Sequence, residues 1–343
     1  MDSVFAYNRP AADSEFLSRK KELGHLTSLL KSRKHALIYE PPKTGKRSLV
    51  LQAEDNLKKS GEEFDSCRIS LLNATDCRTM TEAIRGGVSM TYPGIPVNGI
   101  NEPGEILAAA AAEAGRQGRQ LFLHIEEGQN ILKAEDRERF MSSFWEPVPE
   151  GGPVSCIFTG SRINAMKQLA DEDGHLRETE RVRLSTLEEK AVTDAIIKTF
   201  LKVGRVVEPS QAEHIYESLD GHPWYIWHIS EICFNLTKGY LSDRMVSEAF
   251  HSLLTIHFNR FQDITDSLSG FQISYLKAVY DGAVNRHNMN EIVSAYRLNS
   301  PANVHRVKEA LMKKEVVAFD SDGSPYIIDP LFKMWLKTYY FLS

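Results

Sequence analysis

The first half of this chain alternates short apolar runs with segments of helical periodicity, and this alternation restricts the folds open to it. Apolar residues recur at helical spacing over residues 16–30, from residue 48 onward and over residues 106–114. The short apolar runs, each of strand length, are residues 35–39, 67–72, 120–125 and 154–159. Strands that alternate with helices form a parallel sheet with helices packed on it. The pattern therefore predicts an α/β domain over residues 1–185.

The second half is different, because helical segments replace the alternation after residue 187. The expected helices are residues 188–203, 209–219 and 223–236, and the last two begin with proline, which is favoured in the first turn of a helix. Beyond residue 269, two apolar runs joined by a turn follow three further expected helices, at 272–280, 289–296 and 301–314. Three helices and a hairpin describe a winged helix-turn-helix. We expect a helical lid domain over residues 186–265 and a winged helix domain over residues 266–343.

Composition and charge exclude several other classes of protein. The longest apolar stretches fall far short of the roughly 20 residues of a membrane helix, and the N-terminus carries an acid where a signal peptide carries basic residues. The four cysteines show no C-x-x-C spacing, so neither a zinc site nor a disulfide framework is expected. The net charge of −5 argues against a protein covered with nucleic acid. These features predict a cytoplasmic protein without a membrane span.

The loop after the first strand matches part of the phosphate-binding pattern G-x-x-x-x-G-K-[ST]. In that pattern backbone N–H groups and a helix N-terminus surround the phosphates, the lysine reaches the outer phosphates and the hydroxyl binds Mg²⁺. Glu40 replaces the first glycine and Arg47 replaces the hydroxyl residue. The candidate phosphate-binding residues are Lys43, Thr44, Gly45, Lys46, Arg47 and Ser48. A simple turn between a strand and a helix is the alternative interpretation.

The third strand ends in two acids, Glu126 and Glu127. Paired carboxylates at a strand end downstream of such a loop can direct one group to Mg²⁺ and the next to the attacking water. The alternative is a solvated acidic strand end. Arg162 follows the fourth strand and is a candidate sensor of the outer phosphate, with an ordinary surface arginine as its alternative.

Six segments together resemble the archaeal-type ATPase family of the STAND/AAA+ class of P-loop proteins. These segments are Phe16–Leu23, the loop through Gly45-Lys46, Ile125–Asn130, Thr159–Ser161, Gly221–Pro223 and Asp329–Leu336, and they occur in the family's order. The resemblance implies a P-loop domain, a helical lid and a C-terminal winged helix, with ATP or ADP as the ligand.

The resemblance also implies residue roles. Arg19 would contact the adenine, Lys46 would bind phosphate, and His222 would close over the nucleotide from the lid. Glu126 and Ser48 would serve Mg²⁺, and Glu127 would serve the attacking water.

Two departures from the family pattern predict slow or impaired ATP hydrolysis. Glu40 places negative charge beside the phosphates, and Arg47 cannot ligate a metal, although its guanidinium suits phosphate oxygens. We therefore expect a nucleotide-dependent switch. The alternative is a degenerate scaffold that binds no nucleotide, or a DNA-linked regulator that uses the winged helix.

The charge of the winged helix is modest for a DNA-binding domain. Residues 270–343 hold nine Lys and Arg against seven Asp and Glu, and the wing carries Asp320 and Asp322. This balance predicts weak DNA binding and favours a protein partner for the domain.

Overall fold

The computed structural model of the chain describes residues 3–285 and 289–341. It divides into two compact units. The first unit is Ala12–Ser185, and the second is Thr186–Ser343 together with the N-terminal segment up to Ala11. No helix among the described residues is long and apolar enough to cross a membrane.

The first unit is built on a parallel sheet of five strands with the order β2-β3-β4-β1-β5. The strands are β1 (Ala36–Tyr39), β2 (Phe64–Ser70), β3 (Gln120–Glu126), β4 (Val154–Gly160) and β5 (Glu180–Arg181). All strands are parallel, so their carboxyl ends lie at one edge of the sheet. The predicted α/β class is confirmed.

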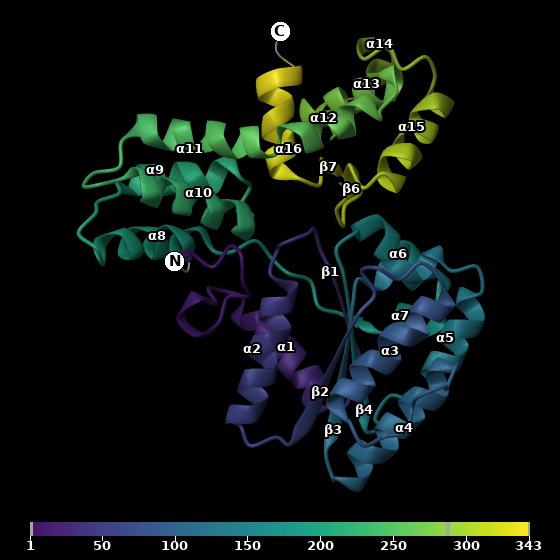
Figure 1. Cartoon of the computed structure of the whole chain (residues 1–343). Coiled ribbons are helices and arrows are strands. Elements are labelled where there is room, and N and C mark those ends of the chain that lie inside the picture. Colours follow the sequence, from purple (N-terminus) through teal and green to yellow (C-terminus); the bar gives the residue numbers. More distant parts are fainter. Residues whose placement is uncertain (1–2, 286–288, 342–343) are drawn as a thin grey trace. The chain divides into compact units, whose positions relative to one another are not determined.

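Helices cover both faces of this sheet (Figure 1). On one face lie α1 (Lys20–Lys31) and α2 (Lys46–Lys59). The other face carries α3 (Cys77–Thr91), α4 (Pro103–Arg116), α5 (Arg137–Trp145), α6 (Ile163–Glu172) and α7 (Gly174–Glu178). Short 3-10 turns are formed by Asp13–Glu15 and Gly128–Lys133. The α1 and α2 helices form because their apolar residues recur every three or four positions, and this stripe packs on Ile38 and Phe122 of the sheet.

The first helix begins later than its apolar spacing predicts. We expected a helix from Phe16, but α1 starts at Lys20, because Ser18 and Arg19 adopt left-handed φ angles of 55° and 58°. The sequence analysis also predicted no helix at α3, α5, α6 or α7 and no strand at β5. The β5 strand pairs with β1 at only two positions, Ala36↔Glu180 and Leu37↔Arg181.

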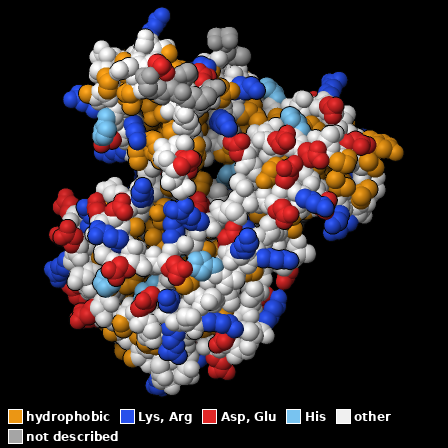
Figure 2. Space-filling view, turned by 180° about the vertical axis from the view of Figure 1, so that it is seen from behind, with side chains coloured by type: hydrophobic (Ala, Val, Ile, Leu, Met, Phe, Trp, Pro, Cys, Tyr) orange, Lys and Arg blue, Asp and Glu red, His pale blue; other side chains and the backbone are white. Residues whose placement is uncertain are grey.

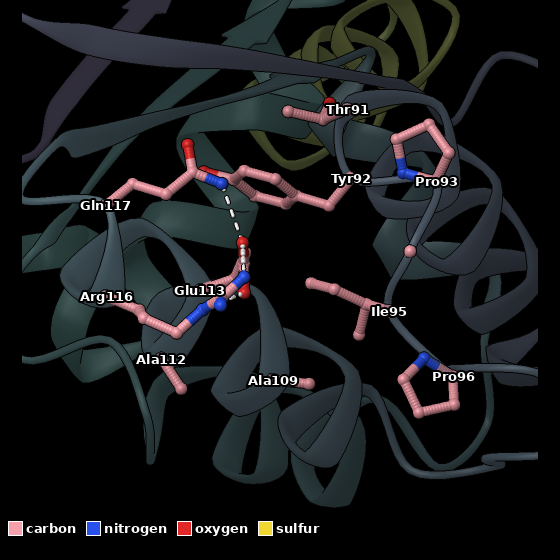
Figure 3. Close-up of a pocket in the computed structure, with 11 residues that line it drawn as sticks. Thr91, Tyr92, Pro93, Ile95, Pro96, Ala109, Ala112, Glu113, Arg116 and Gln117 are labelled. Carbon is pink, nitrogen blue, oxygen red and sulfur yellow. Dashed lines mark hydrogen bonds and ion pairs between the residues drawn. The ribbon is translucent and has the colours of Figure 1, made fainter.

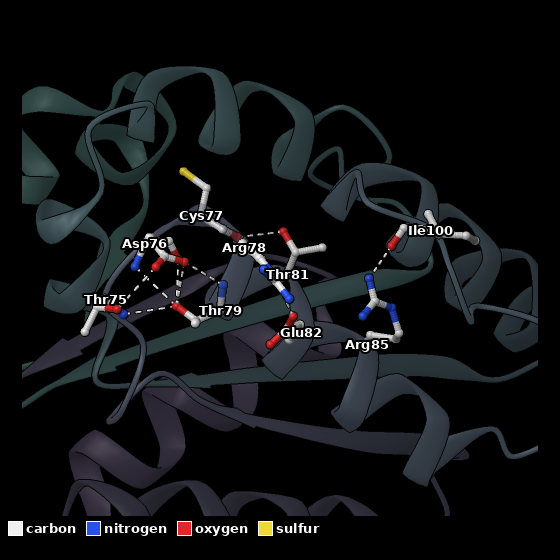
Figure 4. Close-up of polar contacts among 9 residues, drawn as sticks. All are labelled: Thr75, Asp76, Cys77, Arg78, Thr79, Thr81, Glu82, Arg85 and Ile100. Atoms are coloured by element: carbon white, nitrogen blue, oxygen red, sulfur yellow. Dashed lines mark hydrogen bonds and ion pairs between the residues drawn. The ribbon is translucent and has the colours of Figure 1, made fainter.

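The α3 helix has a clear start signal. The Asp76 carboxylate accepts a hydrogen bond from the Thr79 amide at 2.8 Å, and the Thr79 hydroxyl oxygen accepts one from the Asp76 amide at 3.2 Å (Figure 4). This reciprocal cap satisfies two otherwise unpaired donors. Further along α3, the Arg85 guanidinium donates to the Ile100 carbonyl and ties the following loop to the helix.

The second unit begins with five helices. They are α8 (Glu189–Leu201), α9 (Pro209–Ser218), α10 (Pro223–Leu236), α11 (Asp243–Ile256) and α12 (Phe258–Asp266). The N-terminal segment packs on α10, where the Phe5 ring stacks on Trp227 with ring centroids 5.8 Å apart and Tyr7 stacks on His228 at 4.6 Å. Residues that precede the first unit in sequence therefore belong to the core of the second.

The remaining elements form the winged helix. They are α13 (Gly270–Tyr280), a 3-10 turn at Ala283–Asn285, α14 (Met289–Ala295), α15 (Pro301–Lys313), the antiparallel strands β6 (Val317–Phe319) and β7 (Pro325–Ile327), α16 (Pro330–Trp335) and a π-helical turn at Leu336–Tyr340. Trp335 is buried and packs against Phe258 and Phe261 of α12.

Two neighbouring glycines of α3 allow a matched test of helix–sheet packing. A Cβ atom on Gly87 would lie 2.7 Å from Ile69 Cγ1 and 2.9 Å from the Arg68 carbonyl oxygen of β2, whereas a Cβ on Gly86 would meet no atom within 4 Å. We expect Gly87→Ala to destabilise the first unit by about 1–3 kcal/mol. Gly86→Ala should stabilise it by about 0.5–1 kcal/mol, because alanine loses less backbone entropy in a helix. Urea denaturation followed by circular dichroism measures both, and shifts of the same sign would contradict the packing described.

Candidate functional site

The loop after β1 lies at the edge of the sheet where the carboxyl ends of the strands converge. Two of its residues have positive φ angles, Lys43 at 63° and Gly45 at 96°. A Cβ on Gly45 would lie 2.8 Å from Arg19 Nη1, so glycine is required there for both conformation and space. Within the loop, the Thr44 hydroxyl donates to the Pro41 carbonyl at 2.9 Å. The loop is therefore a constrained turn that leads directly into α2.

Lys46 is the first residue of α2, and its ammonium is turned back onto the loop. Nζ donates to the carbonyl oxygens of Glu40 at 2.8 Å and Pro41 at 2.7 Å. Burial lowers the pKa of Lys46 to about 8, and the nearby Glu127 and Glu40 carboxylates oppose this shift in part. Lys46 thus places a partly buried cation at a helix N-terminus, a location that favours an anion.

Arg19 supports the loop from the other side. It is only 7% exposed, and its guanidinium donates to the Thr44 carbonyl at 2.6 Å and to the Ser185 carbonyl at 3.1 Å. Burial lowers the pKa of Arg19 to about 10. Glu22 accepts hydrogen bonds from the Ser185 amide and hydroxyl groups. These contacts join the loop to the residue at which the first unit ends, and the predicted contact of Arg19 with adenine stays a prediction.

Glu40 has a cationic partner that the sequence did not indicate. Its carboxylate lies 3.2 Å from Arg181 Nη2 of β5 and accepts a hydrogen bond from the Leu184 amide at 3.3 Å. The Arg181 guanidinium also covers the Tyr39 ring at 3.6 Å. Burial raises the pKa of Glu40, and Arg181 acts against that shift. Arg181 therefore offsets the negative charge that we expected Glu40 to place beside phosphates. The alternation of charged and apolar residues at 181–184 was the available signal for this edge strand.

Arg47 and Glu126 occupy the two positions at which the loop pattern and the third strand would supply metal ligands. Arg47 Nε lies 3.6 Å from Glu126 Oε1. His124, in the same strand, lies 3.9 Å from that oxygen, and burial lowers the pKa of His124 to about 3, so its ring is neutral at pH 7. Because His124 is neutral, Arg47 is the group that carries a positive charge beside Glu126 in the part of the chain that the structure describes.

The site does not fit Mg²⁺ as the pattern would hold it. A guanidinium stands beside the carboxylate that would ligate the ion, and its positive charge opposes a second cation there. Ser48 follows Arg47 on α2, so its side chain is rotated by about 100°, and it is buried. Within residues 3–285 and 289–341, no group of three or more His, Cys, Asp or Glu side chains could hold a metal. The metal roles of Glu126 and Ser48 stay predictions.

Glu127 lies beside the loop with its carboxylate held in place. It has a left-handed φ of 58°, and its Oε2 accepts hydrogen bonds from Gln129 Nε2 at 2.6 Å and from the Ser161 hydroxyl at the end of β4. Arg162 follows Ser161 as an exposed residue at the same edge of the sheet and occupies the N-cap position of α6 without a side-chain capping hydrogen bond; its predicted role as a phosphate sensor stays a prediction. The first unit thus gathers Lys46, Arg47, Glu126 and Glu127 together.

His222 belongs to the second unit. It is buried, precedes the first turn of α10, and its ring centroid lies 4.7 Å from that of Tyr225. The preceding Gly221 has a φ of 70°, and a Cβ there would lie 2.9 Å from the Tyr216 hydroxyl oxygen. The predicted contact of His222 with a nucleotide stays a prediction.

A separate cavity in the first unit involves none of the predicted residues. It has a volume of about 430 Å³ and lies between the end of α3, the loop at residues 92–96 and α4 (Figure 3). Its polar wall is satisfied internally, because Glu113 accepts hydrogen bonds from Arg116 at 2.9 Å and from Gln117 at 2.6 Å. The Glu113, Arg116 and Gln117 side chains that line this cavity are hydrogen-bonded to one another, so they give no indication of a ligand.

Known proteins are similar to this chain in one domain by sequence and over nearly its whole length by structure. A family model described as "Probable winged helix domain" matches residues 259–338. No curated protein matches the chain in sequence. A Walker-type ATPase of Pyrococcus abyssi is similar in structure, with a TM-score of 0.72 and 13% identity over 96% of this chain and 99% of that one.

Two proteins of Aeropyrum pernix are similar as well. ORC2, solved as ADPNP–ADP complexes, has a TM-score of 0.67 and 15% identity over 97% of this chain and 95% of its own. ORC1, solved in complex with DNA, has a TM-score of 0.52 and 12% identity over 96% of this chain and 94% of its own. At such identities the likeness concerns the fold. The chain has the AAA+ ATPase fold with a C-terminal winged helix domain, which confirms the predicted resemblance to archaeal-type ATPases at the level of fold.

Proposed function

We propose that this chain binds ATP or ADP at the loop between β1 and α2 and works as a nucleotide-dependent switch with slow hydrolysis. The observation that carries the proposal is the position of Lys46, a partly buried cation that begins α2 at the carboxyl edge of a parallel sheet. Parallel α/β sheets bind ligands at this edge, and a helix N-terminus binds phosphate through its free N–H groups. The nucleotide complexes of the similar ORC2 protein support the same ligand class.

Slow hydrolysis follows from the charges around the outer phosphates. Glu127 is close enough to affect Lys46 and is oriented by Gln129 and Ser161, which supports a role of this carboxylate toward the attacking water. The cation beside Glu126 is Arg47, which replaces the hydroxyl residue of the loop pattern. A STAND-type switch is the form of this proposal that the family resemblance implies. A scaffold without nucleotide is the alternative that the next two experiments test.

Replacement of the loop lysine tests the ligand and its site together. We expect Lys46→Ala to weaken ATP binding by roughly 1.5–3 kcal/mol, the scale of a charged hydrogen bond. Isothermal titration calorimetry measures the affinity, and Lys59→Ala at the far end of α2 is the control, with unchanged affinity expected. Equal affinity of Lys46→Ala and the unmodified protein would remove the site assignment.

The lowered pKa of Lys46 predicts how binding depends on pH. Phosphate favours the ammonium form and therefore raises the pKa of Lys46 in the complex. Binding then takes up a proton between the free-state pKa of about 8 and the higher pKa of the complex, so the affinity should be constant below pH 8 and fall across that interval. Lys46→Arg should abolish the fall, because a guanidinium stays charged throughout this range. Identical pH profiles of the two proteins would show that Lys46 is not the titrating group.

The winged helix is a candidate DNA interface, but few of its lysine and arginine side chains are available to bind DNA phosphates. Two lysines already have partners within the unit. Lys308, within α15, has its Nζ 3.9 Å from the Phe319 ring centroid, and Lys314, directly after α15, donates from Nζ to the Ser267 carbonyl at 3.0 Å. On the face shown in Figure 2, acidic and basic side chains are interspersed. The similar ORC1 protein was solved with DNA, which makes duplex DNA the natural ligand to test. We propose weak DNA contact and a protein partner for this domain.

A mobility-shift assay with random duplex across a salt series tests this proposal. Binding through phosphates falls steeply with salt when it depends on a few cations, so we expect no stable complex at physiological ionic strength. Tight binding that resists salt and is lost in Arg306→Ala would contradict the prediction and favour a DNA-linked regulator.

A further inference from the structure

The region beside Lys46 contains a second cation whose hydrogen-bonding capacity is unused. Arg47 is the second residue of α2, and 56% of its side chain is exposed. Its contact with Glu126, at 3.6 Å, is an ion pair that is too long for a hydrogen bond. Among the described residues no hydrogen-bond acceptor is assigned to this guanidinium. Its planar fork of N–H groups is therefore available to an external anion.

The placement of Arg47 is unfavourable unless an anion is bound. Lys46 and Arg47 put two adjacent positive charges in the first turn of α2, where the helix dipole favours negative charge. Glu126 offsets this in part, but Oε1 of its carboxylate is buried and has no hydrogen-bond donor. Arg47 and Glu126 attract each other electrostatically, but no hydrogen bond fixes their geometry. A phosphate that accepts hydrogen bonds from Arg47 would relieve the repulsion between the cations and leave Glu126 beside the guanidinium.

Resting on the function proposed above, we propose that Arg47 is a built-in cation that takes the place of Mg²⁺ on the outer phosphates, with Glu126 as the residue that positions it. A guanidinium matches phosphate oxygens through parallel hydrogen bonds. It also repels a second cation from the Glu126 carboxylate. Nucleotide binding by this chain is therefore independent of divalent cations, in contrast to loops in which a hydroxyl residue holds the metal.

The test compares ATP affinity in excess Mg²⁺ and in EDTA by isothermal titration calorimetry. For the unmodified protein we expect similar affinities in the two buffers. Arg47→Thr should weaken binding in EDTA by about tenfold or more, the effect of losing a charged hydrogen bond, and Mg²⁺ should restore part of the loss. The control is Arg78→Thr, an exposed arginine of α3 paired with Glu82, for which we expect no change in either buffer.

Two further variants test the positioning role of Glu126. Glu126→Gln removes the charge that holds Arg47, so affinity in EDTA should fall while its independence of Mg²⁺ remains. Arg47→Lys keeps the charge without the planar fork, so its affinity in EDTA should lie between those of Arg47→Thr and the unmodified protein. A strong dependence on Mg²⁺ that Glu126→Gln abolishes would instead identify Glu126 as a metal ligand and overturn the inference.

The outcomes separate this inference from the proposed function. If the unmodified protein binds ATP only with Mg²⁺, or if Arg47→Thr binds normally in EDTA, the role of Arg47 is wrong and the nucleotide site stands. If the unmodified protein binds ATP in neither buffer, the proposed function fails and the inference fails with it.

Discussion

Backbone hydrogen bonding between β1, β4 and β3 brings three distant stretches of chain to one edge of the sheet. The β1 strand pairs with β4 from Ala36↔Ile157 to Tyr39↔Gly160, and β4 pairs with β3 in parallel register. The loop after β1, the acids after β3 and Ser161 after β4 therefore meet. Parallel pairing also buries β1 on both sides, so the loop leaves the sheet from a rigid base.

The charges around this loop are arranged in pairs with different degrees of burial. Arg19 is buried and bound to backbone carbonyls, and Arg181 forms an ion pair with Glu40. Arg47 is exposed and bound only through its charge to Glu126. Buried pairs are costly to separate, whereas an exposed pair is screened and moves at little cost. Of these arginines, Arg47 is therefore the one that can move at little cost toward a ligand.

The second unit rests on aromatic packing rather than on a sheet. The N-terminal segment contributes Phe5 to a cluster with Trp227, and the winged helix contributes Trp335 to a cluster with Phe258 on α12. Such aromatic contacts add to the free energy of apolar burial. Because Trp335 is buried in this cluster, it stabilises the unit itself. A partner of the winged helix would have to use other residues.

The sequence by itself determined the alternation of strands and helices, a winged helix in the region of residues 266–343, the Gly45-Lys46 loop and the acids Glu126 and Glu127. These features are local, because periodicity and turn chemistry act over a few residues. Only the tertiary structure decided that Glu40 pairs with Arg181 and that Arg47 pairs with Glu126. The members of each pair lie far apart along the chain and meet only through the strand order. Sequence periodicity does not predict which charged residues form an ion pair. The ion pairs of the site could therefore be identified only from the tertiary structure.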